Sequence, residues 1–183
     1  MSTPYDREHH LEPLPLELLH KPLDYIVADH LRQRVLCVLC EQIADADRID
    51  VDIVREIVDY LRSDMVVHII DEEQDLFPLI RRRAEPEDDI EPALGQLSGD
   101  HAAEERIASA IVAKLEHAIM QPAQSISDDL RTALRQFAQS ERQHLALEKA
   151  TVMPLAKIRL NQRDLRDLAA RMAARRGVLF NGD

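Results

Sequence analysis

A histidine is followed four residues later by a glutamate at three places in this chain. On an α-helix, positions i and i+4 lie on one face, so each pair points an imidazole and a carboxylate in the same direction. The pairs are His68 with Glu72, His101 with Glu105, and His144 with Glu148. In the first and third pairs a proline follows the glutamate by six residues, at Pro78 and Pro154. We call this spacing of histidine, glutamate and proline a frame; the first frame is His68, Glu72 and Pro78, and the second is His144, Glu148 and Pro154. Imidazole and carboxylate together suit iron, zinc or manganese, so the repeated frame indicates a metal site.

Seven residues of these types fall on the apolar faces of the expected helices: His30, His68, Glu72, His101, Glu105, His144 and Glu148. Burying them would cost several kcal/mol for each unpaired charge, and no lysine or arginine on the same faces is placed to neutralise them. Bound cations resolve this conflict. Seven ligands exceed what one octahedral ion needs, and they fit two metals about 3.5 to 4 Å apart with bridging carboxylates and an open position. Redox-active iron is the leading choice.

The other histidines do not fit this pattern. His117 is rotated about 160° around its helix from His101. His9 and His10 belong to the proline-rich N-terminal segment, and a proline separates His20 from the aspartate four residues later. We expect these side chains to lie at the surface or in the arm.

The two cysteines, Cys37 and Cys40, form a C-x-x-C motif inside a helical apolar pattern. The sequence holds no second motif of this kind to complete a zinc tetrahedron, and no strand precedes the motif as in thioredoxin-like proteins. We therefore expect two buried or half-buried, reduced thiols.

Composition and periodicity predict an all-α protein. Glycine is rare, at 4 residues, and aromatic residues make up 3% of the chain, which favours helices around an aliphatic core. Apolar spacing and helix-capping residues predict helices over about 22–44, 50–83, 94–119 and 127–155, and a short fifth helix that begins after Asn161 and ends at Gly177.

These helices predict an up-down-up-down antiparallel four-helix bundle over residues 22–156. Residues 1–21 form an expected N-terminal arm, and residues 157–183 an expected helix and tail that pack on the bundle. The bundle also reads as a degenerate tandem repeat of two helical hairpins. In each hairpin the first helix carries one interior histidine, His30 or His101, and the second carries the histidine, glutamate and proline frame.

The net charge of −11 disfavours binding to nucleic acid or to anionic membrane surfaces. The first 20 residues lack an apolar signal core, and the sequence has no run of about 18 apolar residues. We expect a soluble, cytoplasmic protein.

The ferritin-like di-iron bundle is the main alternative architecture. It requires Glu-x-x-His motifs on two helices. Glu141 and His144 provide one such motif, but the other match, Glu17 and His20, lies in the proline-rich arm. The order of histidine before glutamate describes this sequence better.

The ordered set of His30, His68 with Glu72, His101 with Glu105, and His144 with Glu148 resembles the hemerythrin-like, or HHE cation-binding, family. The resemblance extends from about Pro22 to Leu155. It implies a non-heme di-iron centre bridged by Glu72, Glu148 and a solvent-derived oxo or hydroxo group. It further implies that His30 and His68 bind one iron, and that His101 and His144 bind the other.

Glu105 departs from the oxygen-carrying hemerythrins, which have a histidine at that position. An anionic ligand stabilises ferric iron, so we expect reversible oxygen carriage to be disfavoured. The first functional hypothesis is a protein that binds or senses oxygen, nitric oxide or peroxide at an open iron position. A di-iron enzyme that turns over peroxide or nitric oxide is the second, with Glu105 or Glu148 aiding proton transfer. The third is an iron-storage or regulatory module. Its partner would be another protein, or a second copy of this chain in a homo-oligomer.

Overall fold

The computed structural model describes residues 11–121 and 125–179, which contain helices and no strand. Their order is η1 (Leu16–His20), α1 (Pro22–Asp45), α2 (Val51–Arg62), α3 (Asp64–Asp71), η2 (Glu72–Leu76), α4 (Phe77–Arg83), η3 (Pro86–Asp88), α5 (Glu91–Met120), α6 (Asp128–Ala150), α7 (Val152–Arg159) and α8 (Gln162–Arg175). Here η1 and η3 are 3₁₀ helices and η2 is a π-helix.

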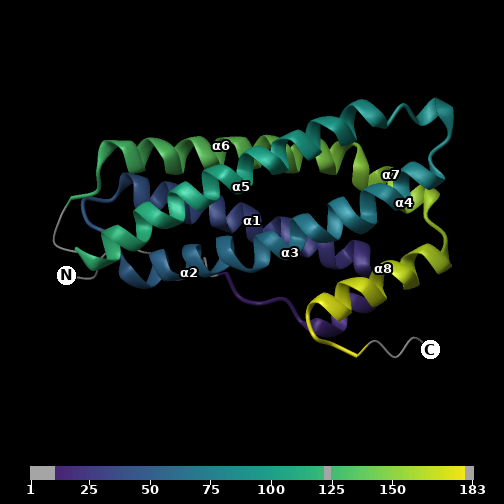
Figure 1. The fold of residues 1–183 in the computed structure, drawn as a ribbon, viewed down its shortest axis with the longest axis horizontal. Helices are drawn as coiled ribbons and strands as arrows, with labels where there is room; N and C mark the ends of the chain where they lie inside the picture. The colour runs from purple at the N-terminus through teal and green to yellow at the C-terminus, as the bar shows by residue number, and fades with distance from the viewer. Residues whose placement is uncertain (1–10, 122–124, 180–183) are drawn as a thin grey trace.

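Four antiparallel columns form the bundle (Figure 1). The columns are α1, the series α2 to α4, α5, and the pair α6 and α7, and α8 lies against one end. The predicted all-α, four-helix architecture is confirmed. Among the described helices, none is both long and apolar enough to cross a membrane.

The predicted continuous helix over residues 50–83 is interrupted at two points. At Ser63, the side-chain hydroxyl donates to the Asp59 carbonyl at 2.5 Å, which competes with the regular backbone ladder. The second interruption is the π-helix η2, where the Phe77 amide donates to the Glu72 carbonyl five residues earlier. Pro78 follows at once, and it has no amide hydrogen to continue an α-helical ladder. The proline of the first frame therefore accompanies a local widening of the helix that begins at Glu72.

The proline of the second frame produces a break of a different kind. Helix α6 ends at Ala150 and α7 begins at Val152, with Thr151 between them. The Thr151 hydroxyl donates to the Leu147 carbonyl at 2.7 Å. Pro154 lacks an amide hydrogen and its ring would crowd the carbonyl of Ala150, four residues earlier, so the helix breaks there.

Capping residues fix the helix ends as the sequence predicts. Ser127 accepts a hydrogen bond from the Leu130 amide at the start of α6. Asn161 accepts from two amides at the start of α8 and forms a capping box with Asp164. After α8, Gly177 adopts a φ of 69°, a left-handed conformation that favours glycine at a helix end.

The apolar core is divided into two clusters along the bundle axis. One includes Leu36, Ile57, Leu115 and Phe137, and the other includes Ile26, Leu76, Leu94 and Val152. On each column the predicted metal-ligating histidines fall between these two sets of residues. The polar residues therefore form a layer between two aliphatic cores.

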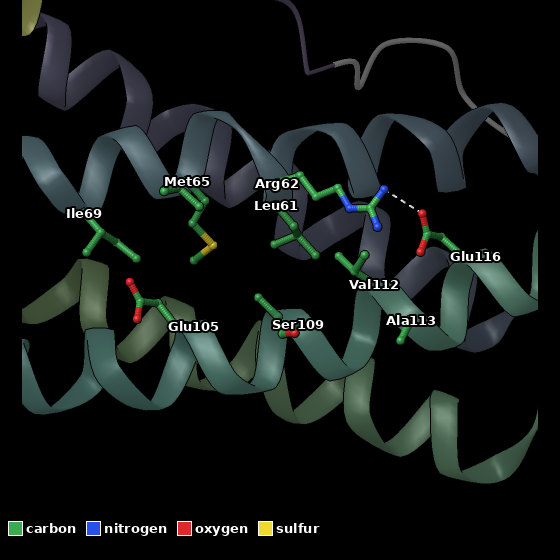
Figure 2. Close-up of a pocket in the computed structure, with 11 residues that line it drawn as sticks. Leu61, Arg62, Met65, Ile69, Glu105, Ser109, Val112, Ala113 and Glu116 are labelled. Carbon is green, nitrogen blue, oxygen red and sulfur yellow. Dashed lines mark ion pairs between the residues drawn. The ribbon is translucent and has the colours of Figure 1, made fainter. Parts of the chain in front are cut away.

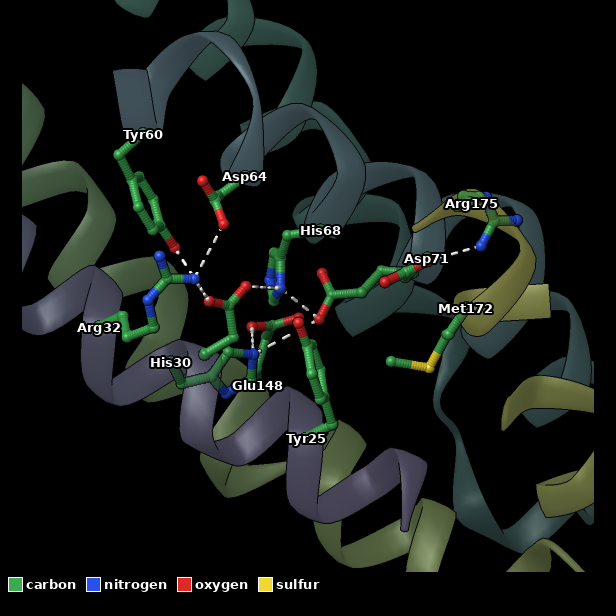
Figure 3. A network of polar contacts seen from close by, with 12 residues as sticks. Tyr25, His30, Arg32, Tyr60, Asp64, His68, Asp71, Glu148, Met172 and Arg175 are labelled. Atoms are coloured by element: carbon green, nitrogen blue, oxygen red, sulfur yellow. Dashed lines mark hydrogen bonds and ion pairs between the residues drawn. The ribbon is translucent and has the colours of Figure 1, made fainter. Parts of the chain in front are cut away.

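Helix α8 is attached to the bundle by arginine and aspartate pairs. Arg175 contacts Asp71 and Asp75, which flank Glu72 in sequence, and Arg171 also pairs with Asp75 at 2.7 Å. Both aspartates are almost fully buried, and Figure 3 shows Arg175 directed at Asp71. The C-terminal helix thus holds the segment that carries Glu72.

Replacing Arg175 with alanine should destabilise this attachment. The change leaves two buried carboxylates with one arginine partner each, so we expect the free energy of unfolding to fall by about 2 kcal/mol. Arg166→Ala on the same helix is the control, because Arg166 is exposed and forms no ion pair within the described chain. Urea denaturation of both variants measures the difference, and equal midpoints would contradict this account of how α8 is attached.

Candidate metal centre

Six of the seven predicted site residues meet in the polar layer. The shortest contacts are centred on two glutamates that are completely buried, Glu72 and Glu148. Glu72 Oε1 lies 3.3 Å from His68 Nε2, and Glu72 Oε2 lies 3.3 Å from His101 Nε2. Glu148 Oε2 lies 3.1 Å from His30 Nε2 and 3.6 Å from His144 Nε2. Each glutamate therefore links histidines that come from different columns of the bundle.

The six residues form two overlapping groups with geometry suited to metal ions. One group is His30, His68, Glu72 and Glu148, and the other is Glu72, His101, His144 and Glu148. Within each group the candidate ligand atoms lie within 4.8 Å of one another. Both glutamates belong to both groups, and the histidines divide in the same way as the family resemblance implies.

Several buried atoms in this cluster lack a hydrogen-bond partner. They include His68 Nε2, His101 Nε2, Glu72 Oε2 and both carboxylate oxygens of Glu148. The 3.1 Å approach of Glu148 Oε2 to His30 is therefore close without hydrogen-bond geometry. Buried polar atoms are normally satisfied, because leaving one unpaired costs about 1 to 3 kcal/mol. A set of unpaired imidazole nitrogens and carboxylate oxygens that face one another fits bound cations.

When no cation is bound, protons on the histidines can balance the negative charge of the buried glutamates. Burial lowers the pKa of His30, but Glu148 and Glu72 outweigh it and raise the pKa to about 10. His101 behaves alike: burial opposes its charge, yet Glu72 and Glu73 raise its pKa to about 10. Burial and the nearby positive charge of His101 lower the pKa of His144 to about 3. Burial also opposes the charge of His68, but Glu72 and Asp29 outweigh it and raise the pKa of that ring. Protons on at least two histidines therefore balance the buried glutamates when no metal is bound.

Two of the histidines have a carboxylate partner on the ring nitrogen that faces away from the centre. His68 Nδ1 lies 3.1 Å from Asp29, and His101 Nδ1 lies 2.7 Å from Glu73. Asp29 also accepts hydrogen bonds from Arg32 and Tyr60. Such partners fix the ring orientation and leave Nε2 free to bind a metal. Neither carboxylate was predicted from the sequence as part of the site, although Asp29 and Glu73 are each adjacent in sequence to a predicted ligand.

A buried pair of carboxyl groups lies behind His144. Glu104 Oε1 is 3.9 Å from His144 Nδ1, and Glu104 interacts with Glu141 on the facing helix. Burial raises the pKa of Glu104 to about 7. Burial, together with Glu104 and Glu148, raises the pKa of Glu141 well above its usual value. The pair therefore holds a proton near neutral pH, unlike the ionised carboxylate behind His68.

The prediction that Glu105 faces the interior is wrong. Its side chain is exposed, and it lines a groove of about 470 Å³ between α2, α3 and α5. Figure 2 shows it beside Ile69 and Met65, and no member of the six-residue cluster lines this groove. The interior positions of α5 instead run through Leu97, His101 and Glu104. The expected bias against oxygen carriage, which rested on Glu105 as a ligand, loses its structural basis.

The remaining expectations concern the other histidines and the two cysteines. His117 is exposed, as predicted, and His20, which was not expected to bind a metal, is exposed as well. Cys37 and Cys40 are buried and form no disulfide, also as predicted. Burial raises the pKa of Cys37 to about 12, which favours the uncharged thiol. His9 and His10 lie outside the described residues.

The fold and this cluster together define a class: helical bundles that bind cations between their helices through histidine and carboxylate side chains. Residues 21–156 match the family model of the hemerythrin HHE cation binding domain. Because this match covers more than half of the chain, the protein belongs to the hemerythrin HHE family. A comparison with curated proteins gives no match.

The two glutamates at positions 72 and 105 allow a matched test of the cluster. Glu72→Gln removes a charge shared by both groups. It should lower the affinity for metal by at least about tenfold, and the metal content of the purified protein should fall as a result. Glu105→Gln makes the same chemical change at an exposed carboxylate and should leave the metal content unchanged. Elemental analysis of both variants after equal metal loading provides the measurement. Equal losses in both would place Glu105 in the centre and contradict the interior assignment of α5.

Metal binding should release protons. His30 and His101, with pKa values of about 10, are protonated at pH 7.5 in the metal-free protein, and each must lose a proton to bind a metal. The pKa of His68 is raised as well, so we expect release of at least about two protons per chain, and the affinity should rise at least about 100-fold per pH unit near neutral pH. Calorimetry in buffers of different ionisation enthalpy measures the release. A heat of binding independent of the buffer would contradict it.

The same shifts predict the stability of the metal-free protein. The folded state binds these two protons more tightly than the unfolded state, where the histidine pKa is about 6.5. The stabilisation is complete below about pH 6.5 and is lost as the pH rises towards 10. Metal-loaded protein should not show this loss, because the metal has already displaced the protons.

Proposed function

We propose that this protein is a non-heme di-iron protein that binds or senses a small oxidant, namely oxygen, nitric oxide or peroxide. The observation that carries the proposal is the pair of four-residue groups that share Glu72 and Glu148. Two groups with two imidazoles each and two common carboxylates match the needs of a two-metal site. Iron is favoured because the donor set contains imidazole and carboxylate and no thiolate.

In this proposal His30 and His68 would hold one iron and His101 and His144 would hold the other, and Glu72 and Glu148 would contribute to both sites. Iron bound there supplies redox chemistry and a position for a small ligand. Each group provides four protein residues, which is fewer than the six ligands of an octahedral ion. The unfilled positions support binding of a further small molecule.

Burial of the cluster restricts what can reach it. The two glutamates are fully buried, and the most exposed of the six residues, His30, is only 6% exposed. A diatomic molecule or a peroxide is small enough for such an interior, whereas a larger organic substrate would need the helices to separate. This burial supports binding or sensing of a small oxidant over the processing of a bulky substrate.

Turnover of peroxide or nitric oxide is the second candidate function. One observation favours it: Glu104, with a pKa of about 7, lies near His144 and shares its buried environment with Glu141. A carboxyl group that titrates near neutral pH is suited to exchange protons. Glu104 replaces Glu105 as the candidate for this role, because Glu105 lies at the surface.

Anaerobic loading with ferrous iron followed by exposure to oxidant tests the proposal. We expect close to two irons per chain, and we expect a charge-transfer band in the near ultraviolet after oxygen, nitric oxide or peroxide is added. A band that disappears on degassing indicates reversible binding, and a single stable change indicates sensing. Continued consumption of oxidant above the rate of free iron indicates an enzyme.

A metal-site variant provides the control for this experiment. His101→Ala should lose iron from one group and weaken the spectral change, while His117→Ala, at an exposed position, should behave as the unmodified protein. Iron content well below one per chain after reconstitution, or no spectral response to any of the three oxidants, would refute the proposal.

A further inference from the structure

A cavity of about 420 Å³ lies between α1 and the break that separates α6 from α7. His30 is among its lining residues, so the cavity reaches the wall of the metal cluster. Lys149, Met153 and Pro154, on either side of the helix break, line it as well. The cavity therefore exists where the second proline frame interrupts its helix.

Three cations surround this cavity: Arg34, Lys149 and Lys157. All three are exposed, and within the described chain none of them forms an ion pair. No aspartate or glutamate lines the cavity. By contrast, the arginines of α8 that face the bundle are paired with aspartates. A group of unpaired cations is unusual on a chain with a net charge of −11, and it attracts an anion.

The walls of the cavity are apolar. Leu31 is 58% exposed and Val27 is 37% exposed, although both are large aliphatic residues on the bundle surface. Leu145 and Met153, which are almost fully buried, also contribute to the lining. Aliphatic walls with cations close by complement a ligand that has an apolar body and an anionic group.

We propose that this cavity binds a small organic carboxylate with an aliphatic body. The aliphatic part would contact Val27, Leu31 and Met153, and the carboxylate would pair with Arg34, Lys149 and Lys157. The volume is within the range of roughly 300 to 1,000 Å³ that is typical of small-molecule sites. The cavity lies beside the cluster at His30, and its lining contains no other member of the cluster, so the inference stands whether or not the centre holds iron.

Titration calorimetry with octanoate tests the charge requirement, with octanol and octylammonium as ligands of the same chain length. The full-length protein should bind octanoate, and it should bind the neutral and cationic ligands at least about tenfold more weakly. Higher salt should weaken octanoate binding, because the cations are exposed to solvent.

Charge-reversal variants test the location. Arg34→Glu should weaken octanoate binding on the order of tenfold, and the double change Lys149→Glu with Lys157→Glu should weaken it further. Arg48→Glu is the matched control, because Arg48 is exposed, has no ion pair within the described residues and does not line the cavity. Melting curves establish that each variant is folded. Equal affinity of the Arg34 and Arg48 variants would overturn the proposal.

Methyl NMR of the methionines gives an independent readout of the position. Octanoate should shift the Met153 methyl signal in zinc-loaded protein, which is diamagnetic. The signals of Met65, which lines the groove at Glu105, and of Met120, which is 80% exposed at the end of α5, should stay in place. Shifts confined to Met65, or equal binding of octanol and octanoate, would refute a carboxylate site at this cavity.

Discussion

The concentration of negative charge between two aliphatic cores is the constraint on which the rest of the structure depends. Glu72 and Glu148 are fully buried, and no lysine or arginine contacts either of them within the described chain. Isolated carboxylates in such an interior would neutralise or disrupt the fold. Four histidines surround the two glutamates, and they can supply the missing positive charge in either of two ways. When no metal is present, His30 and His101 hold extra protons, whereas the pKa of His144 is lowered to about 3 and its ring stays neutral. When cations bind, the protonated histidines release those protons. Metal binding and folding are therefore linked through the same six side chains.

The residues behind His68 and those behind His144 differ in charge. Behind His68, Asp29 is ionised and bound by Arg32, so that side carries a balanced pair of charges. Behind His144, Glu104 and Glu141 have no such cation, and burial raises the pKa of both. One group thus has a rigid ionic support, while the other adjoins a carboxyl pair that can gain or lose a proton near neutral pH. This difference arises from residues outside the repeated frame, so an internal repeat has produced two unequal halves of one centre.

Helical periodicity predicted most of the fold and all six cluster residues, but it also predicted a seventh, Glu105, that lies outside the cluster. This failure has a geometric reason. Interior positions of packed helices alternate between spacings of three and four residues. On α6 the step from His144 to Glu148 is one of four, so the glutamate faces inward. On α5 the step of four already lies between Leu97 and His101, so the next interior position is Glu104. The phase of the apolar pattern could have identified Glu104. The form of each interruption, a π-helix before Pro78 and a break at Thr151, could not be predicted because it depends on local hydrogen bonding.

The two proline frames show how similar sequences acquire different surroundings. Within the first frame, Asp71 ends α3 and Asp75 lies in the π-helix, and arginines of α8 pair with both. After the second, the break at Thr151 adjoins an open cavity with unpaired cations and an approach to His30. Helix α8 covers the aspartates of the first frame, whereas the cavity beside the second frame is lined by exposed cations. The C-terminal helix therefore neutralises buried charge on one side of the bundle, while the cations on the other side lie beside His30 without acidic partners among the residues that line the cavity.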